Sequence, residues 1–184
     1  FLENYCVTLS ELLMPASDIS EQISLAGTEA SGTGCMKLML NGAVTLGTLD
    51  GANIEIREAV GDDNIIIFGM KNEEVNALKA RGYNPEDIYA KNETIRKCIN
   101  RMYQGINGCV FSEVANSLKS QDPYMVLADF ESYRQAQKFS SETYRDKMKW
   151  AKMSLNNIAG AGVFAADRSI KEYAERIWNL KSIK

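Results

Sequence analysis

The sequence predicts an α/β fold in which helices flank a parallel sheet and the C-terminal end is rich in helices. Residues 43–48 and 65–69 are short apolar runs without alternation, which is typical of strands buried on both faces of a parallel sheet. Helical patterns precede, separate and follow these runs. Strands that alternate with helices indicate βα units, so we expect a Rossmann-like sheet.

The part before the first apolar run is predicted to contain one extended and three helical segments. In chain order these are an extended segment at 2–7, a short helix opened by the capping box Thr8–Glu11 and stopped near Pro15, one or two helical turns at 18–25, and a helix at 33–40 that Asn41-Gly42 ends.

The middle of the chain is predicted to alternate, and the second half to be mostly helical. The middle elements are a strand at 43–48, a turn at Asp50-Gly51, a helix at 52–60, a strand at 65–69 and a helix at 72–80 that stops at Gly82. The later elements are a helix start at Asn84-Pro85, a helix at 92–103, a strand at 124–127, helices at 129–139 and 143–159, and a final helix opened by the capping box Ser169–Glu172 and running to about Trp178.

Residues 1–184 are predicted to form a single unit, with an α/β part at 1–83 and a mainly helical part at 84–184. A net charge of −3 gives no electrostatic reason to expect nucleic acid or an anionic membrane as a partner. Apolar runs are all far shorter than the roughly 20 residues that span a bilayer. The first residue is Phe1 rather than Met and the opening residues 1–7 are typical of part of a strand, so we expect a fragment of a longer protein.

The cysteine and histidine content excludes several kinds of catalytic and metal site. The four cysteines form no CxxC pair, which is typical of reduced thiols in a cytoplasmic protein. Histidine is absent, which excludes Ser-His-Asp and Cys-His catalysis and histidine-based metal sites within this chain. We therefore expect no metal site.

The segment Glu29–Asn41 carries the clearest chemical signal. It places Lys37 in an otherwise apolar helical run directly after a glycine-rich turn. Such a turn leaves backbone N–H groups free at a helix N-terminus, where an anion is favoured. A lysine in apolar surroundings reaches its neutral, nucleophilic form more easily. A phosphate cradle beside an activated amine is what pyridoxal phosphate (PLP) requires.

Other interpretations of this segment also deserve weight. A P-loop needs lysine where Thr33 stands, and a dinucleotide fingerprint needs glycine where Lys37 stands. The glycines also fit a simple tight turn, and Lys37 alone also fits a lysine whose stem lies along apolar surface. The spacing of these residues alone does not decide between a tight turn with a surface lysine and a PLP-binding site.

The segment Glu29–Asn41 resembles, position for position, the PLP-attachment segment of the α-glucan (glycogen, starch and maltodextrin) phosphorylases. The similarity extends over nearly the whole chain and includes Phe1–Tyr5, Asp18–Ser24, Asn41–Asn53, Ile67–Met70 and Ile177-Trp178. The resemblance implies the latter part of the C-terminal domain of a GT-B glycosyltransferase fold.

The resemblance also implies residue roles. Lys37 would be the catalytic residue that attaches PLP. The cofactor would further contact Thr33, Gly34 and Tyr5, and the transferred glucosyl unit would contact Glu29, Ala30, Ser31 and Gly32. Cys6 and Cys35 depart from the family pattern, where many members carry arginine and asparagine. We expect both to be small buried residues rather than reactive thiolates.

The implied activity is phosphorolysis of α-1,4-glucan to glucose 1-phosphate, a hexosyltransferase reaction with PLP as cofactor and inorganic phosphate as co-substrate. Further implied partners are the upstream half of the same enzyme and a second copy in a homodimer. Because phosphate-binding residues of the family lie upstream of Phe1, we expect the fragment alone to be inactive. Two alternatives stay open: a GT-B nucleotide-sugar glycosyltransferase, and a non-catalytic packing or dimerisation module.

Overall fold

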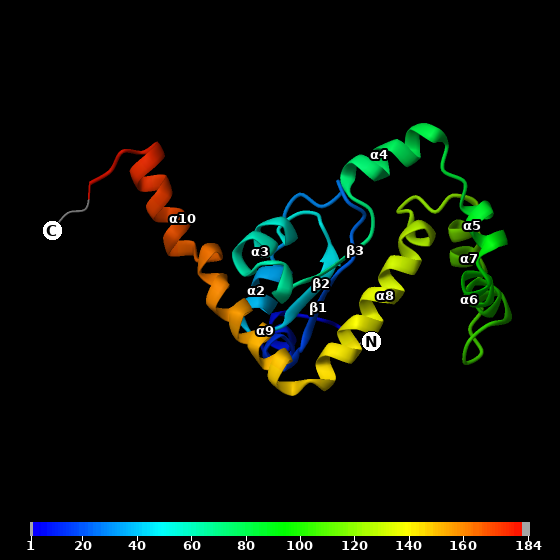
Figure 1. Ribbon diagram of the computed structural model, residues 1–184, viewed down its shortest axis with the longest axis horizontal. Helices are drawn as coiled ribbons and strands as arrows, with labels where there is room; N and C mark the ends of the chain where they lie inside the picture. Colours follow the sequence, from blue (N-terminus) through cyan, green and yellow to red (C-terminus); the bar gives the residue numbers. More distant parts are fainter. Residues whose placement is uncertain (1, 182–184) are drawn as a thin grey trace.

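The computed structural model describes residues 2–181 and contains a three-stranded parallel sheet (Figure 1). The strands β1 (Ile19–Gln22), β2 (Val44–Thr48) and β3 (Ile66–Phe68) lie in the order β1-β2-β3. Every residue of the central strand β2 is buried, as its apolar run predicts. The α/β fold with a parallel sheet and the strands predicted at 43–48 and 65–69 are confirmed.

Helices cover both faces of this sheet. On one face, Val44 and Leu46 of β2 pack with Trp150 and Met153 of α9 (Lys147–Gly160) and with Ala136 of α8 (Val126–Arg145). On the other face lie α2 (Gly34–Leu40) and α3 (Asn53–Val60), whose shared core is formed by Cys35, Met39, Ala52 and Ile56. The Tyr144 hydroxyl of α8 donates to Asp18 Oδ2 at 3.1 Å, next to the start of β1.

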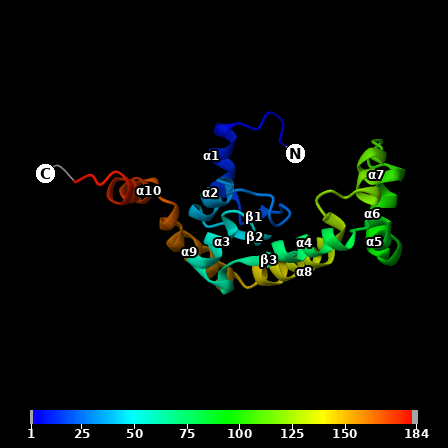
Figure 2. The ribbon, with the colours of Figure 1, turned by 90° about the horizontal axis from the view of Figure 1, so that it is seen from above.

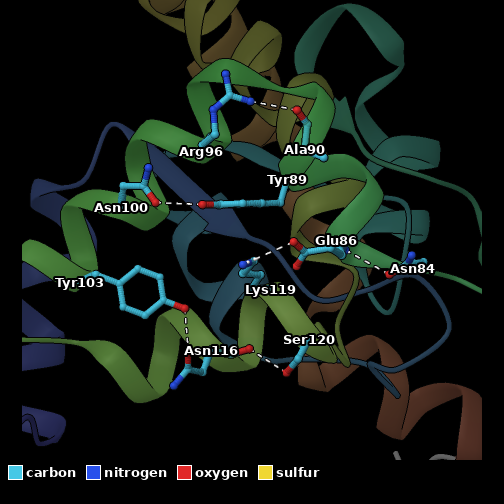
Figure 3. Close-up of polar contacts among 10 residues, drawn as sticks. All are labelled: Asn84, Glu86, Tyr89, Ala90, Arg96, Asn100, Tyr103, Asn116, Lys119 and Ser120. Atoms are coloured by element: carbon cyan, nitrogen blue, oxygen red, sulfur yellow. Dashed lines mark hydrogen bonds and ion pairs between the residues drawn. The ribbon is translucent and has the colours of Figure 1, made fainter.

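A helical module stands away from the sheet (Figure 1). It consists of α5 (Pro85–Lys91), α6 (Glu93–Gln104) and α7 (Ser112–Ser120), and α4 (Asn72–Arg81) leads into it from β3. Its core is built around Ile95, Ile99 and Ala115, with Leu127 of α8. Exposed polar pairs join the helices at the surface, such as Tyr89 with Asn100 and Tyr103 with Asn116 (Figure 3).

The two ends of the described chain project from this body. Helix α1 (Val7–Ala16) precedes β1, and the short turns η1 (Asp62–Asn64) and η2 (Ala161–Phe164) follow α3 and α9. Helix α10 (Ala166–Glu172) continues as a π-helical turn, η3 (Tyr173–Ile177), and extends away from the sheet (Figure 1). The chain exposes 12305 Å² of surface, whereas a compact monomer of this mass exposes about 8,900 Å². The arrangement is therefore elongated.

Several predicted elements are wrong. The described residues before α1 form no strand, and residues 18–25 contain β1 rather than helical turns. Pairing of Ile19 with Val44 and of Gln22 with Gly47 forms a parallel ladder along β2. This tertiary pairing overrides the local helix-start signal of Asp18 and Glu21.

The strand predicted at 124–127 is wrong for a different reason. The Asp122 carboxylate accepts the N–H groups of Val126 and Leu127 at 2.9 and 2.8 Å, and this stabilises the start of α8 in place of a strand. Helix α7 was not predicted from the sequence. The last helix begins at Ala166, before the capping box Ser169–Glu172, and α1 begins at Val7 with no side-chain cap.

Candidate functional site

The predicted site loop lies at the carboxyl edge of the sheet. Residues 23–33 leave the carboxyl end of β1 and lead into α2, and Asp50 follows the carboxyl end of the neighbouring strand β2. Open α/β sheets bind their ligands at this edge, where loops from adjacent strands meet. The sheet therefore places residues 27–33 where a ligand site is expected.

One buried carboxylate fixes the backbone of this loop. Asp50 Oδ1 accepts the N–H of Gly27 at 2.9 Å, and Oδ2 accepts the N–H groups of Thr28 and Glu29 at 3.2 and 2.9 Å. Three bonds to an ionised acceptor give this loop a defined backbone. Sequence reasoning did not single out Asp50 as a site residue. The available signal was an aspartate placed between a buried strand and a glycine.

Gly51 makes a second connection between β2 and the loop. Its φ is +51°, and an added Cβ would lie 2.5 Å from the carbonyl oxygen of Ser31. The next residue, Ala52, donates its N–H to the same Ser31 oxygen at 2.7 Å. Only glycine allows the strand exit and the loop to approach this closely.

Helix α2 presents Lys37 on its outward side. Cys35 and Met39 are buried against α3, with exposed fractions of 2% and 0%, whereas the Lys37 side chain is exposed. Two residues along a helix correspond to a rotation of about 200°, so Lys37 points away from the side that carries Cys35. The expectation that apolar neighbours within this chain enclose Lys37 is therefore wrong.

Comparison with known proteins identifies the family. The family model described as "Carbohydrate phosphorylase" matches residues 1–180. This chain belongs to the carbohydrate phosphorylases. Among its relatives, the muscle form of glycogen phosphorylase from Rattus norvegicus is 46% identical over 98% of the chain. Glycogen phosphorylase from Pasteurella multocida is 47% identical over 100% of the chain. The resemblance to α-glucan phosphorylases is confirmed.

The alignment covers only part of each phosphorylase relative. The chain spans 22% of the length of the rat protein and 23% of the length of the Pasteurella protein. Most of the polypeptide of these relatives therefore has no counterpart in the 184 residues.

The remaining predicted site residues of this phosphorylase chain fall into two groups. Six of them are contiguous and form the loop and the first turn of α2: Glu29, Ala30, Ser31, Gly32, Thr33 and Gly34. All of these except Gly32 and Gly34 are exposed. Tyr5 is 60% exposed and belongs to the segment before α1, which lies at the end of α1 away from the sheet (Figure 2).

The two departing cysteines differ in environment. Burial raises the pKa of the Cys35 thiol, and its Sγ lies 3.5 Å from the Gly32 carbonyl oxygen, so Cys35 is the small buried residue that we expected. Cys6 is exposed at the N-cap of α1, so that part of the expectation is wrong. Hydrogen bonds from the backbone N–H groups of Leu9 and Thr8 lower the pKa of Cys6.

Within residues 2–181, no helix combines the length and apolar character needed to cross a membrane. Across the same residues, histidine, cysteine, aspartate and glutamate side chains form no group of three or more that could hold a metal ion.

Proposed function

We propose that the complete protein containing this chain is an α-glucan phosphorylase. It would release glucose 1-phosphate from α-1,4-glucan by phosphorolysis with PLP as cofactor, in the C-terminal domain of a GT-B fold. The observation that carries this proposal is the family match over residues 1–180, which includes the segment Glu29–Asn41. The position of that segment at the carboxyl edge of the sheet supports the proposal.

The residues at the start of α2 fit a phosphate-bearing cofactor. A Cβ added at Gly34 would meet no atom within 4 Å, so the space beside the first turn is open. The N-cap Thr33 makes no side-chain capping bond, which leaves its hydroxyl for a ligand. The Lys37 amine is accessible on the same short helix. These groups are a hydroxyl, backbone N–H donors and a primary amine, which together suit PLP.

In the bound state PLP would supply a phosphate group that exchanges a proton with the substrate phosphate. Lys37 would hold the cofactor covalently, and Thr33 and Gly34 would orient it through the hydroxyl and the backbone N–H. Fixed donors of this kind stabilise charge in the transition state without reorganising during the reaction.

The loop would bind the glucosyl unit through its side chains and through the backbone of the residues that follow Glu29. The N–H groups of Gly27, Thr28 and Glu29 already donate to Asp50 and are not free for a sugar. The Glu29 carboxylate and the Ser31 hydroxyl are exposed, and Ala30 and Gly32 flank them. Asp50 therefore orients the loop, and Glu29 and Ser31 supply the polar groups that would contact the glucose hydroxyls.

The exposure of Lys37 and of this loop indicates that the rest of the protein would complete the site. We propose that the upstream half covers them, that the chain alone is inactive, and that the complete enzyme is a cytoplasmic protein able to form a homodimer. The oligomer and the location are carried over from the family, and Tyr5 would reach the cofactor only in the complete protein.

The decisive experiment is cofactor attachment in the complete protein. PLP is added, the linkage is reduced with borohydride, and the labelled peptide is mapped by mass spectrometry. We expect the label on Lys37. It should disappear in Lys37→Ala and persist in Lys79→Ala, which removes an exposed lysine of α4.

Two outcomes would contradict the proposal. Label spread over many surface lysines, with no loss in Lys37→Ala, would favour a non-catalytic packing module. Binding of UDP-glucose or ADP-glucose without PLP attachment would favour a nucleotide-sugar glycosyltransferase. Release of glucose 1-phosphate from glucan and phosphate by the unaltered protein would support the reaction itself.

A further inference from the structure

A cavity lies on the face of the sheet that α8 covers, away from α2 and α3. Its volume is about 230 Å³. Four aromatic side chains line it, namely Phe68, Tyr124, Phe130 and Tyr133, together with aliphatic residues that follow β1 and with one carboxylate, Asp129. Pockets for drug-sized ligands are commonly about 300–1,000 Å³, so this cavity suits a smaller molecule.

Asp129 is the one charged group among the lining residues. The residue is 9% exposed, and its Oδ1 accepts the N–H of Met70 at 2.8 Å. Within residues 2–181, no donor is hydrogen-bonded to Oδ2. Burial and the nearby carboxylates of Glu74 and Asp122 raise the pKa of Asp129. This end of the cavity is therefore electronegative, and a cation bound there would relieve the cost of the buried charge.

The aromatic walls provide the second half of the recognition chemistry. Tyr133 packs edge-to-face against Phe68 with ring centroids 5.1 Å apart. Its hydroxyl donates to Glu21 Oε2 at 3.2 Å and accepts from the Gln137 amide at 2.8 Å, which fixes the ring. Tyr124, which is 65% exposed, lines the cavity where it reaches solvent. Aromatic faces attract cations, and several around one carboxylate favour quaternary ammonium groups.

We propose that this cavity binds a small organic ammonium ion, with its charge beside Asp129 and its alkyl groups against Phe68, Phe130 and Tyr133. A hydrated metal ion fits poorly, because one free carboxylate oxygen and apolar walls cannot replace its oxygen ligands. A neutral apolar molecule would displace water and leave the Asp129 charge without compensation.

The test compares choline with 3,3-dimethylbutan-1-ol, in which carbon replaces the charged nitrogen in the same shape. Each is titrated into the complete protein and followed by isothermal titration calorimetry. We expect choline to bind at least tenfold more tightly, which corresponds to about 1.4 kcal/mol. Equal affinity for the two probes, or no detectable binding of choline at millimolar concentration, overturns the proposal.

Single substitutions test the contributions of the carboxylate and of the aromatic walls to choline binding separately. Asp129→Asn keeps an oxygen that can accept from Met70, and we expect it to lower choline affinity at least tenfold while the affinity for the alcohol stays the same. Phe130→Leu keeps an apolar wall without an aromatic face and should lower the preference for choline several-fold. Tyr103→Phe is the matched control, since Tyr103 lies on α6 and is not among the residues that line the cavity, so choline affinity should stay unchanged.

Thermal unfolding midpoints show that each variant is folded before affinities are compared. If Asp129→Asn is folded and binds choline as tightly as the unaltered protein, Asp129 does not recognise the charge and the proposal fails. If Phe130→Leu is folded and keeps the full preference for choline, the aromatic part of the proposal fails.

Discussion

The loop at 27–33 and the module α5–α7 are stabilised in opposite ways. The loop depends on one buried group, Asp50, whose carboxylate accepts three backbone N–H groups. The module depends on an apolar core shared by three helices, and its polar pairs lie at the surface. A loop held by one side chain can present exposed groups in a defined geometry, but a single substitution can disorder it. A module with a distributed core tolerates the loss of any one surface contact.

The largest expected effect comes from removing the acceptor in the loop. Asp50→Ala leaves three N–H groups without their charged partner, each bond being worth about 1.5 kcal/mol. We expect a loss of about 4 kcal/mol in the local stability of the loop. Hydrogen exchange of the amides of residues 27–29 should accelerate strongly, while α5–α7 stays protected.

Asp50→Asn is the control for this prediction. It keeps one acceptor oxygen but turns the other toward an N–H as a donor, so an intermediate loss is expected. Unchanged exchange at residues 27–29 in Asp50→Ala would show that the loop does not depend on this carboxylate.

The next largest effect is expected in the module. Ile99 is 1% exposed and packs in the core of α5–α7. Ile99→Ala should lower the free energy of unfolding of the module by about 3 kcal/mol because it leaves a cavity. Urea unfolding checks the value, with hydrogen exchange assigning the loss to residues 85–120. The exchange of residues 27–29 should not change, and a parallel increase there would contradict independence of the two regions.

A smaller effect is expected from Gly51→Ala. The added methyl group would lie against the Ser31 carbonyl oxygen, and the positive φ is unfavourable for alanine. Together these should cost about 2 kcal/mol. Urea unfolding measures the cost, and Gly82→Ala is a useful control because its φ is also positive and left-handed while an added Cβ meets no atom within 4 Å. Equal losses in both variants would mean that φ alone, and not the approach to Ser31, sets the cost.

The smallest effect is expected from Tyr103→Phe. This substitution removes the exposed hydrogen bond to Asn116, 2.7 Å long, and keeps the ring (Figure 3). A surface bond of this kind is worth about 0.5 kcal/mol. A loss as large as that of Ile99→Ala, measured in the same urea titration, would contradict the view that the core carries the stability of the module.

Local pattern and tertiary context explain what the sequence could predict. The run 43–48 is apolar because both faces of β2 are covered. In β3, Ile66 and Phe68 are buried and Ile67 is exposed, but the unbroken apolar run still indicates a strand. The strand β1 has the sequence Ile-Ser-Glu-Gln, which carries no apolar pattern typical of a strand. It forms because it pairs with β2, and that tertiary contact is not visible in the local sequence. Helix α8 begins where the Asp122 carboxylate accepts the N–H groups of Val126 and Leu127, and this turn needs positive φ at Asp122 and Met125, which the apolar pattern of 124–127 does not reveal.

In the candidate site, too, residues that are close in sequence could be predicted and residues brought together by the fold could not. The contiguous residues from Glu29 to Lys37 could be found from a motif because they share one loop and one helix. Asp50 acts from another strand, and the aromatic cavity gathers residues from β3, α8 and the segments after β1 and before α8. Spatial neighbours that are far apart in sequence leave no local signature. The outward direction of Lys37 follows from which side of α2 packs on α3.

The return of α8 and α9 to the sheet has a consequence for synthesis on the ribosome. Tyr144 contacts Asp18 across 126 positions of the chain, and Trp150 and Met153 complete the core over β2. The strands thus emerge long before the helices that cover them, while α5–α7 can close through local contacts as soon as it emerges. We expect the module to acquire its shape first and the nascent sheet to stay aggregation-prone until α9 has left the exit tunnel.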